Sequence, residues 1–134
     1  MAKLTVIEGI AEVLEEKLKK AGVGSVEKLL EVGGTRKGRQ DLAAASGIEP
    51  KRLLRFVNYA DLMRINGIGG EYAELLEAAG VDSVAELAQR RSDNLHTKMV
   101  EANEKKSLVR QVAAATQVEQ WIEQAKKLPK AVHH

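Results

Sequence analysis

The sequence predicts an all-α protein built from two similar halves. Ala, Leu, Glu and Lys dominate its 134 residues, and only 3% of the residues are aromatic. Apolar side chains recur at helical spacing, as at Leu14 and Leu18 or at Leu95 and Met99. The third observation is an internal repeat, and a repeat of this length sets the architecture of a chain.

The repeat has two registers. Two motifs return 58 residues later: Ile7-Glu8-Gly9-Ile10 becomes Ile65-Asn66-Gly67-Ile68, and Ala21-Gly22-Val23 becomes Ala79-Gly80-Val81. The ends of the halves match at an offset of 65, where Leu53, Phe56, Val57 and Ala60 correspond to Val118, Trp121, Ile122 and Ala125. The second half therefore carries about seven extra residues, which we place around Glu104–Ala115.

Capping residues and helix breakers set the expected helix ends. Ser25, Thr35 and Ser92 are N-cap candidates, and capping boxes are predicted at Ser83 with Glu86 and at Thr116 with Glu119. Asn58, three residues before Asp61, predicts a cap for a separate short helix. Gly22, Gly33, Gly47 and Gly80 stand where helices should stop, and Pro50 suits a first turn. The predicted helices are 11–21, 26–32, 36–46, 50–58, 59–64, 70–79, 84–91, 93–103, 106–112 and 117–128.

Phe56 and Trp121 occupy equivalent places in the two halves. Each lies on an apolar helical stripe, so we predict that both are core residues and not a surface for stacking. The two halves are expected to pack around one core. The prediction is thus a single compact domain, residues 1–128, made of repeats 4–64 and 65–128, followed by a tail at 129–134.

The segment Leu62–Leu76 has a short helix, a tight Gly67-Ile68-Gly69 turn and then a second helix. It resembles the helix-hairpin-helix motif of DNA-repair and recombination proteins, and Leu4–Leu18 resembles the same motif more weakly. From Leu4 to Leu128, the chain resembles a family of small bacterial double helix-hairpin-helix proteins usually labelled as a domain of unknown function. The resemblance implies two fused helix-hairpin-helix repeats.

In nucleic-acid-binding proteins with this motif, backbone N–H groups of the turn hold a phosphate without reading sequence. The resemblance transfers that role to Gly67, Ile68, Gly69 and Gly70. The matching positions of the first half are Gly9, Ile10, Ala11 and Glu12.

Two features depart from the binding pattern. Ala11 stands where the second turn has Gly69, and carboxylates follow both turns, at Glu12, Glu15 and Glu16 and at Glu71, Glu74 and Glu77. Carboxylates stabilise a helix start but repel a phosphate. Each turn is therefore either a phosphate site or a packing device that joins two helices.

Positive charge is concentrated elsewhere, between Arg36 and Arg55. Six basic residues stand there against two acidic ones, whereas residues 65–91 carry five acidic residues and two basic ones. The basic set is either a solvated helix face or a nucleic-acid-binding surface. Its members are Arg36, Lys37, Arg39, Lys51, Arg52 and Arg55.

No catalytic, metal or cofactor site is predicted. The chain has no Cys, and His96 is its only internal histidine; we set aside His133 and His134 as resembling the remnant of a purification tag. The usual hydrolase, metalloprotease, phosphate-loop and dinucleotide motifs are missing, and no small-molecule substrate is indicated. No apolar run approaches the length of a membrane span, and no signal peptide is visible, so the expected location is cytoplasmic.

The sequence therefore predicts a non-enzymatic binding module. The leading interpretation is weak, sequence-independent binding to the backbone of DNA or RNA, through the Gly67–Gly70 turn and the basic residues between Arg36 and Arg55. The alternative is a protein-interaction or assembly module that keeps the helix-hairpin-helix fold without binding phosphate.

Overall fold

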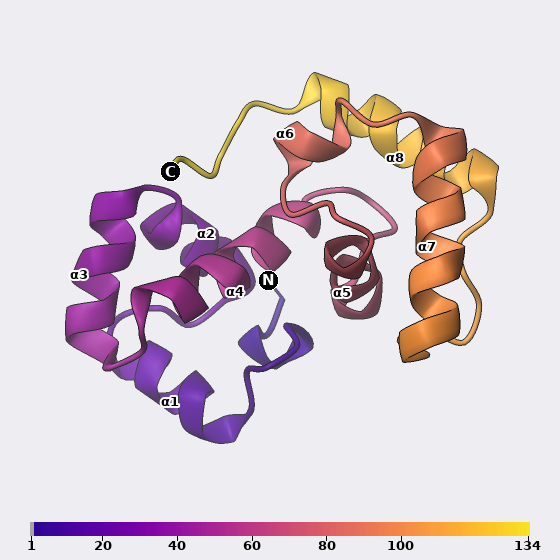
Figure 1. Cartoon of the computed structure of the whole chain (residues 1–134). Helices are drawn as coiled ribbons and strands as arrows, with labels where there is room; N and C mark the ends of the chain where they lie inside the picture. Colours follow the sequence, from indigo (N-terminus) through magenta and orange to yellow (C-terminus); the bar gives the residue numbers. More distant parts are fainter. Residues whose placement is uncertain (1) are drawn as a thin grey trace. The chain divides into compact units, whose positions relative to one another are not determined.

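The computed structural model describes residues 2–134, and these residues form helices joined by turns, with no strand among them (Figure 1). The all-α prediction is confirmed. The chain divides into two units. Unit 1 comprises the residues up to Asp61 together with Ala131–His134, and unit 2 comprises Leu62–Lys130.

Unit 1 begins with a short 3-10 helix, η1, and continues with four α-helices. Helix α3 packs against α1 and α2, and η1 packs against α1. Helix α4 buries one face, which includes Leu53, Phe56 and Tyr59. The elements are η1 (Leu4–Val6), α1 (Glu12–Lys20), α2 (Val26–Gly33), α3 (Arg36–Ser46) and α4 (Pro50–Leu62), the last residue of α4 falling in unit 2.

Unit 2 contains four α-helices. Helix α7 packs against α5 and α8, and α6 packs against α8. Trp121 of α8 is 1% exposed and meets Tyr72 of α5 edge to face, with ring centroids 5.2 Å apart. The elements are α5 (Gly70–Ala78), α6 (Val84–Leu87), α7 (Ser92–Lys106) and α8 (Ala115–Lys127).

The backbone of one turn recurs 58 residues later. Gly9 has φ 96° and Gly67 has φ 98°, both in the region that favours glycine. Ala11 (φ −103°, ψ −172°) and Gly69 (φ −97°, ψ −170°) are the N-caps of α1 and α5. The hydrogen bond from Ile7 N–H to the Leu4 carbonyl and its counterpart from Ile65 to Leu62 are both 3.1 Å long. Since Ala11 holds the same conformation as Gly69, this position does not require glycine.

An aromatic ring lies against the positive-φ glycine of the repeated turn in each unit. A Cβ on Gly9 would lie 2.9 Å from Cε1 of Phe56, and a Cβ on Gly67 would lie 3.0 Å from Nε1 of Trp121. Phe56 is 2% exposed, so the predicted burial of both aromatic residues is confirmed. Glycine is required here for two reasons, the backbone conformation and the closeness of the ring.

Three predicted helical features differ from the structure. The predicted helices 50–58 and 59–64 form one helix, α4, so Asn58 lies inside it and caps nothing. The predicted helix 106–112 is absent, because α7 ends at Lys106 and Ser107 adopts φ 51°, which breaks the helix. Thr116 lies within α8 and does not cap it.

The extra residues of the second half lengthen α7 and the connection after it. Eight residues, 107–114, join α7 to α8, whereas three residues, 47–49, join α3 to α4. The side-chain amide of Asn103 fixes this longer connection, because it donates to the Val109 carbonyl at 3.0 Å and accepts from the Val109 N–H at 2.9 Å. Tyr72 holds it again by donating to the Gln111 carbonyl at 3.0 Å.

Three predicted N-caps are confirmed. The hydroxyls of Ser25, Thr35 and Ser83 accept hydrogen bonds from first-turn N–H groups. The Glu86 carboxylate accepts from the N–H of Asp82, at 3.4 Å, so this motif departs from a reciprocal capping box. Ser92 is the first residue of α7 and not its cap. Gly22, Gly47 and Gly80 end helices with positive φ, whereas Gly33 is the last residue of α2 and has no positive φ.

Candidate nucleic-acid interface

Five of the predicted basic residues are exposed on unit 1. Arg36 and Lys37 stand in the first turn of α3, where Thr35 caps the helix by accepting from the Gly38 N–H at 3.0 Å. Lys51, Arg52 and Arg55 are exposed on α4. We call these five residues the cationic surface.

Four members of the cationic surface carry unneutralised charge. Within residues 2–134, the side chains of Arg36, Lys37, Lys51 and Arg52 form no ion pair. Lys20, by contrast, reaches the Glu16 carboxylate at 3.5 Å on α1. The charge of these four side chains is therefore available to an external anion, because no carboxylate within residues 2–134 pairs with them.

A pocket of about 460 Å³ lies between the first turns of α3 and α4. Arg36, Arg39 and Lys51 line it, with Pro50 and Leu54 as its apolar wall. No carboxylate side chain lines this pocket. Gln40 and His134 complete the lining, so three cationic side chains line this pocket near the starts of two helices.

Arg39 differs from the other predicted basic residues because it is buried, with 5% of its surface exposed. Its Nη1 donates to the Gly33 carbonyl at 2.9 Å, and its Nη2 donates to the His133 carbonyl at 2.8 Å. Burial, and then the nearby charge of Arg36, lower the pKa of the Arg39 guanidinium from its ordinary value. Arg39 therefore has a structural role inside unit 1, although it also lines the pocket with Arg36 and Lys51.

Arg52 connects the cationic surface to the first glycine turn. Its guanidinium carbon lies 5.6 Å from the centroid of the Phe56 ring, and the edge of that ring contacts the position of Gly9. Arg55 makes the same kind of contact with Tyr59, at 5.7 Å. The sequence placed only glutamates after the first turn. The structure adds a cation, because Arg52 lies over the Phe56 ring that contacts this turn.

The second glycine turn, Gly67–Gly70, lies in unit 2, whereas the cationic surface lies in unit 1. The side chain of Ile68 is 4% exposed and belongs to the core, so Ile68 could contact a ligand of this turn only through its backbone. Gln124 of α8 fixes the turn, because its Oε1 accepts from the Asn66 N–H at 3.0 Å. Gly67 and Gly69 of this turn are exposed.

Helices α1 and α5 start without a side-chain cap. Their N-cap residues, Ala11 and Gly69, have no side-chain oxygen to accept from the first-turn N–H groups. These N–H groups can donate to an external acceptor, which is the property that a phosphate site needs. Exposed Glu71 in the first turn of α5 opposes an anion there.

Sequence reasoning missed Arg110, which is exposed in the connection between α7 and α8. Arg110 lines a pocket of about 530 Å³ together with Glu71 and Tyr72, at the first turn of α5. The seven-residue difference between the two offsets was the available signal, because the inserted segment contains this cation. A predicted helix at 106–112 placed Arg110 on a helix face and hid its position near α5.

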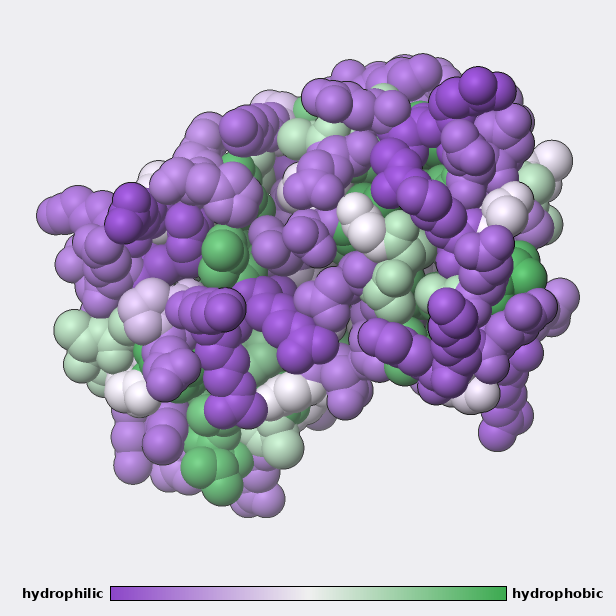
Figure 2. Space-filling model, in the orientation of Figure 1, coloured by the Kyte–Doolittle hydropathy of each residue, from purple (hydrophilic) through white to green (hydrophobic). Residues whose placement is uncertain are grey.

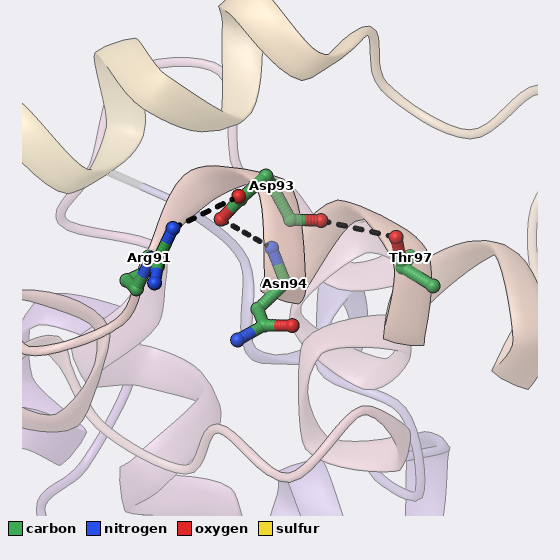
Figure 3. Close-up of polar contacts among 4 residues, drawn as sticks. All are labelled: Arg91, Asp93, Asn94 and Thr97. Atoms are coloured by element: carbon green, nitrogen blue, oxygen red, sulfur yellow. Dashed lines mark hydrogen bonds and ion pairs between the residues drawn. The ribbon is translucent and has the colours of Figure 1, made fainter.

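Polar contacts at the start of α7 are local (Figure 3). Arg91 reaches the Asp93 carboxylate at 3.2 Å, and the Asn94 N–H donates to the same carboxylate at 2.8 Å. Thr97 donates to the Asp93 carbonyl at 3.1 Å. Asp93 thus neutralises Arg91, so this cluster stabilises the helix start and presents less charge than the cationic surface.

Hydrophilic residues cover most of the face drawn in Figure 2, and apolar residues form separate areas on it. Within residues 2–134, no group of three or more His, Asp or Glu side chains is placed to hold a metal ion. None of the helices in the same range has the length and hydropathy needed to cross a membrane.

The structure defines an all-helical class of protein in which a glycine turn and an aromatic residue recur in two units. The chain belongs to the family described as domain of unknown function DUF4332, whose model matches residues 8–128. No curated protein and no solved structure matches the chain at a significant level.

Proposed function

We propose that this protein is a non-enzymatic module that binds the nucleic-acid backbone weakly and without sequence preference. The cationic surface supports this proposal most directly, because four of its five side chains form no ion pair within residues 2–134. Phosphate contacts supply most of the affinity in sequence-independent binding. We further propose a cytoplasmic location for the module.

The likeness to the helix-hairpin-helix motif gives the proposal a second support. Both glycine turns precede helices whose first N–H groups have no side-chain cap, at Ala11 and Gly69. In unit 1 the turn lies beside the Phe56 ring on which Arg52 stacks. A phosphate held by such N–H groups would gain from this positive charge.

A titration against duplex and single-stranded DNA at several salt concentrations tests the proposal. Log K should fall linearly with log salt concentration, by about 0.9 per phosphate neutralised on duplex. Replacing Arg36, Lys37 and Lys51 together by Gln should lower this slope by about three and weaken binding by more than about tenfold at low salt.

The matched control replaces Lys17, Lys19 and Lys20 of α1 by Gln, which removes the same net charge from the same unit. It should keep most of the affinity, because Lys19 and Lys20 already pair with glutamates of α1. Equal losses in the two triple variants would show that net charge, and not the cationic surface, governs binding.

The acidic first turn of α5 favours a second candidate, a protein-interaction or assembly module. Glu71 stands where a bound phosphate would be repelled. Glu71→Lys should strengthen DNA binding if the Gly67–Gly70 turn contacts phosphate. If the wild type does not bind DNA even at low salt and Glu71→Lys does, the turn has the geometry to hold a phosphate but does not do so in the wild type. The protein-interaction module is then the better conclusion.

A further inference from the structure

The chain's last four residues, Ala131–His134, pack on unit 1, although helix α8 before them belongs to unit 2. In Figure 1 the end of the chain lies beside α2 and α3. The side chain of Val132 is 3% exposed. The sequence predicted residues 129–134 as a tail, and its last four residues pack on unit 1.

The backbone of His133 is held on both sides. Its N–H donates to the Gly34 carbonyl at 2.7 Å, and its carbonyl accepts from Arg39 Nη2 at 2.8 Å. The other terminal nitrogen of Arg39 donates to the Gly33 carbonyl, which fixes the guanidinium in place. Since both contacts to residue 133 use backbone atoms, they do not depend on the identity of its side chain.

The segment approaches unit 1 closely at Gly34. A Cβ on Gly34 would lie 2.6 Å from the carbonyl oxygen of Ala131, a distance that side-chain carbons do not adopt. The backbone of Gly34 is helical, with φ −65° and ψ −25°, so its own conformation does not require glycine. The same Cβ would lie 2.9 Å from the Leu30 carbonyl oxygen, so the segment and the end of α2 together exclude a larger residue.

We propose that Gly33, Gly34 and Arg39 form a binding site for a non-helical peptide segment, which residues 131–134 occupy in cis. The site selects an aliphatic side chain at the position of Val132 and accepts the next residue through its backbone. We call it the peptide seat. A second copy of the same segment, supplied in trans, fits the seat by the same contacts.

The occupant is exchangeable on physical grounds. One buried side chain and two backbone hydrogen bonds favour the docked segment, whereas ordering four residues opposes it. These opposing contributions are of similar size, so the docked and released states lie close in free energy. Unit 1 would then take a competing peptide when the cis segment is weakened.

Amide hydrogen exchange at His133 tests the seat in the full chain. The wild type should protect this N–H, and Gly34→Ala should speed its exchange by about tenfold or more, because the new methyl group displaces Ala131. Gly24→Ala is the matched control, since a Cβ at Gly24 has no atom within 4 Å. An unprotected His133 in the wild type, or equal exchange in the two variants, would overturn the proposal.

A labelled peptide with the sequence of residues 128–134 tests exchange in trans. It should bind the full-length Val132→Gly variant about tenfold more tightly than the wild type, because the cis segment no longer competes. The Gly34→Ala/Val132→Gly double variant should not bind it, nor should Val132→Gly bind a peptide carrying the same substitution. Binding of the peptide to the double variant would refute the seat, and so would the absence of binding to the Val132→Gly variant. Circular dichroism checks that each variant keeps its helix content.

Discussion

The two glycine turns have nearly the same backbone but different surroundings. In unit 1, Gly9 lies against Phe56, and Arg52 stacks on that ring. In unit 2, Gly67 lies against Trp121, whose ring meets Tyr72. The comparison shows what this turn needs, which is a glycine at positive φ with an aromatic residue close to it. The charge around the turn is free to differ.

The charge differs between one segment of unit 1 and one segment of unit 2. Residues 36–55 of unit 1 hold six basic and two acidic side chains, whereas residues 65–91 of unit 2 hold five acidic and two basic ones. Because attraction follows the local charge, residues 36–55 suit an anionic partner better than residues 65–91 do. An acidic first turn in α5 suits a basic partner better. One fold thus supports opposite electrostatic preferences.

The largest expected effect comes from removing the aromatic residues. Trp121→Ala and Phe56→Ala should each lower the free energy of unfolding by about 3–5 kcal/mol, because each leaves a cavity in a buried core. Urea denaturation followed by circular dichroism measures both. Similar losses would show that the two rings have the same role. A loss below about 1 kcal/mol for either would contradict its place in the core.

The next effect separates the two glycines of the second turn. Gly67→Ala should cost about 1–2 kcal/mol, because φ 98° is unfavourable for alanine and the methyl group would crowd Trp121. Gly69→Ala should change stability by less than about 0.5 kcal/mol, because its Cβ would meet no atom within 4 Å and Ala11 already adopts this conformation. Thermal or urea denaturation distinguishes them, and equal costs would be evidence against the equivalence of the two turns.

Features set by local sequence were predictable. The caps at Ser25, Thr35 and Ser83 were found because a hydroxyl accepts a bond from an N–H only three residues away. Burial of Phe56 and Trp121 followed from their place on an apolar stripe. The exposed cations of α3 and α4 were also located, since charged residues rarely enter a core.

Features set by distant contacts were not predictable. Arg39 looked like its basic neighbours, but its partners include the His133 carbonyl, 94 residues away. The connection after α7 is non-helical, and Asn103 and Tyr72 hold it. Asn58 resembled a cap, yet α4 continues through it. For Arg39 and for the connection after α7, a local preference lost to a contact that the local sequence does not contain.

The smallest expected effect tests whether the two units use their caps equally. Ser25→Ala and Ser83→Ala should each cost about 1 kcal/mol, because each removes one bond to a first-turn N–H, of 3.1 Å and 3.2 Å. Ser92→Ala is the control, since Ser92 is the first residue of α7 and Arg91 is its N-cap. Its effect should stay within about 0.5 kcal/mol.

Urea denaturation of the three variants under one set of conditions measures these differences. Because α6 is only four residues long and α2 is eight, α6 has fewer helical hydrogen bonds to compensate for a lost cap. Ser83→Ala should therefore be at least as costly as Ser25→Ala. A clearly larger loss of unfolding free energy for Ser25→Ala would show that the two caps contribute unequally despite their matching geometry. The equivalence between the two units would then be limited to the glycine turns.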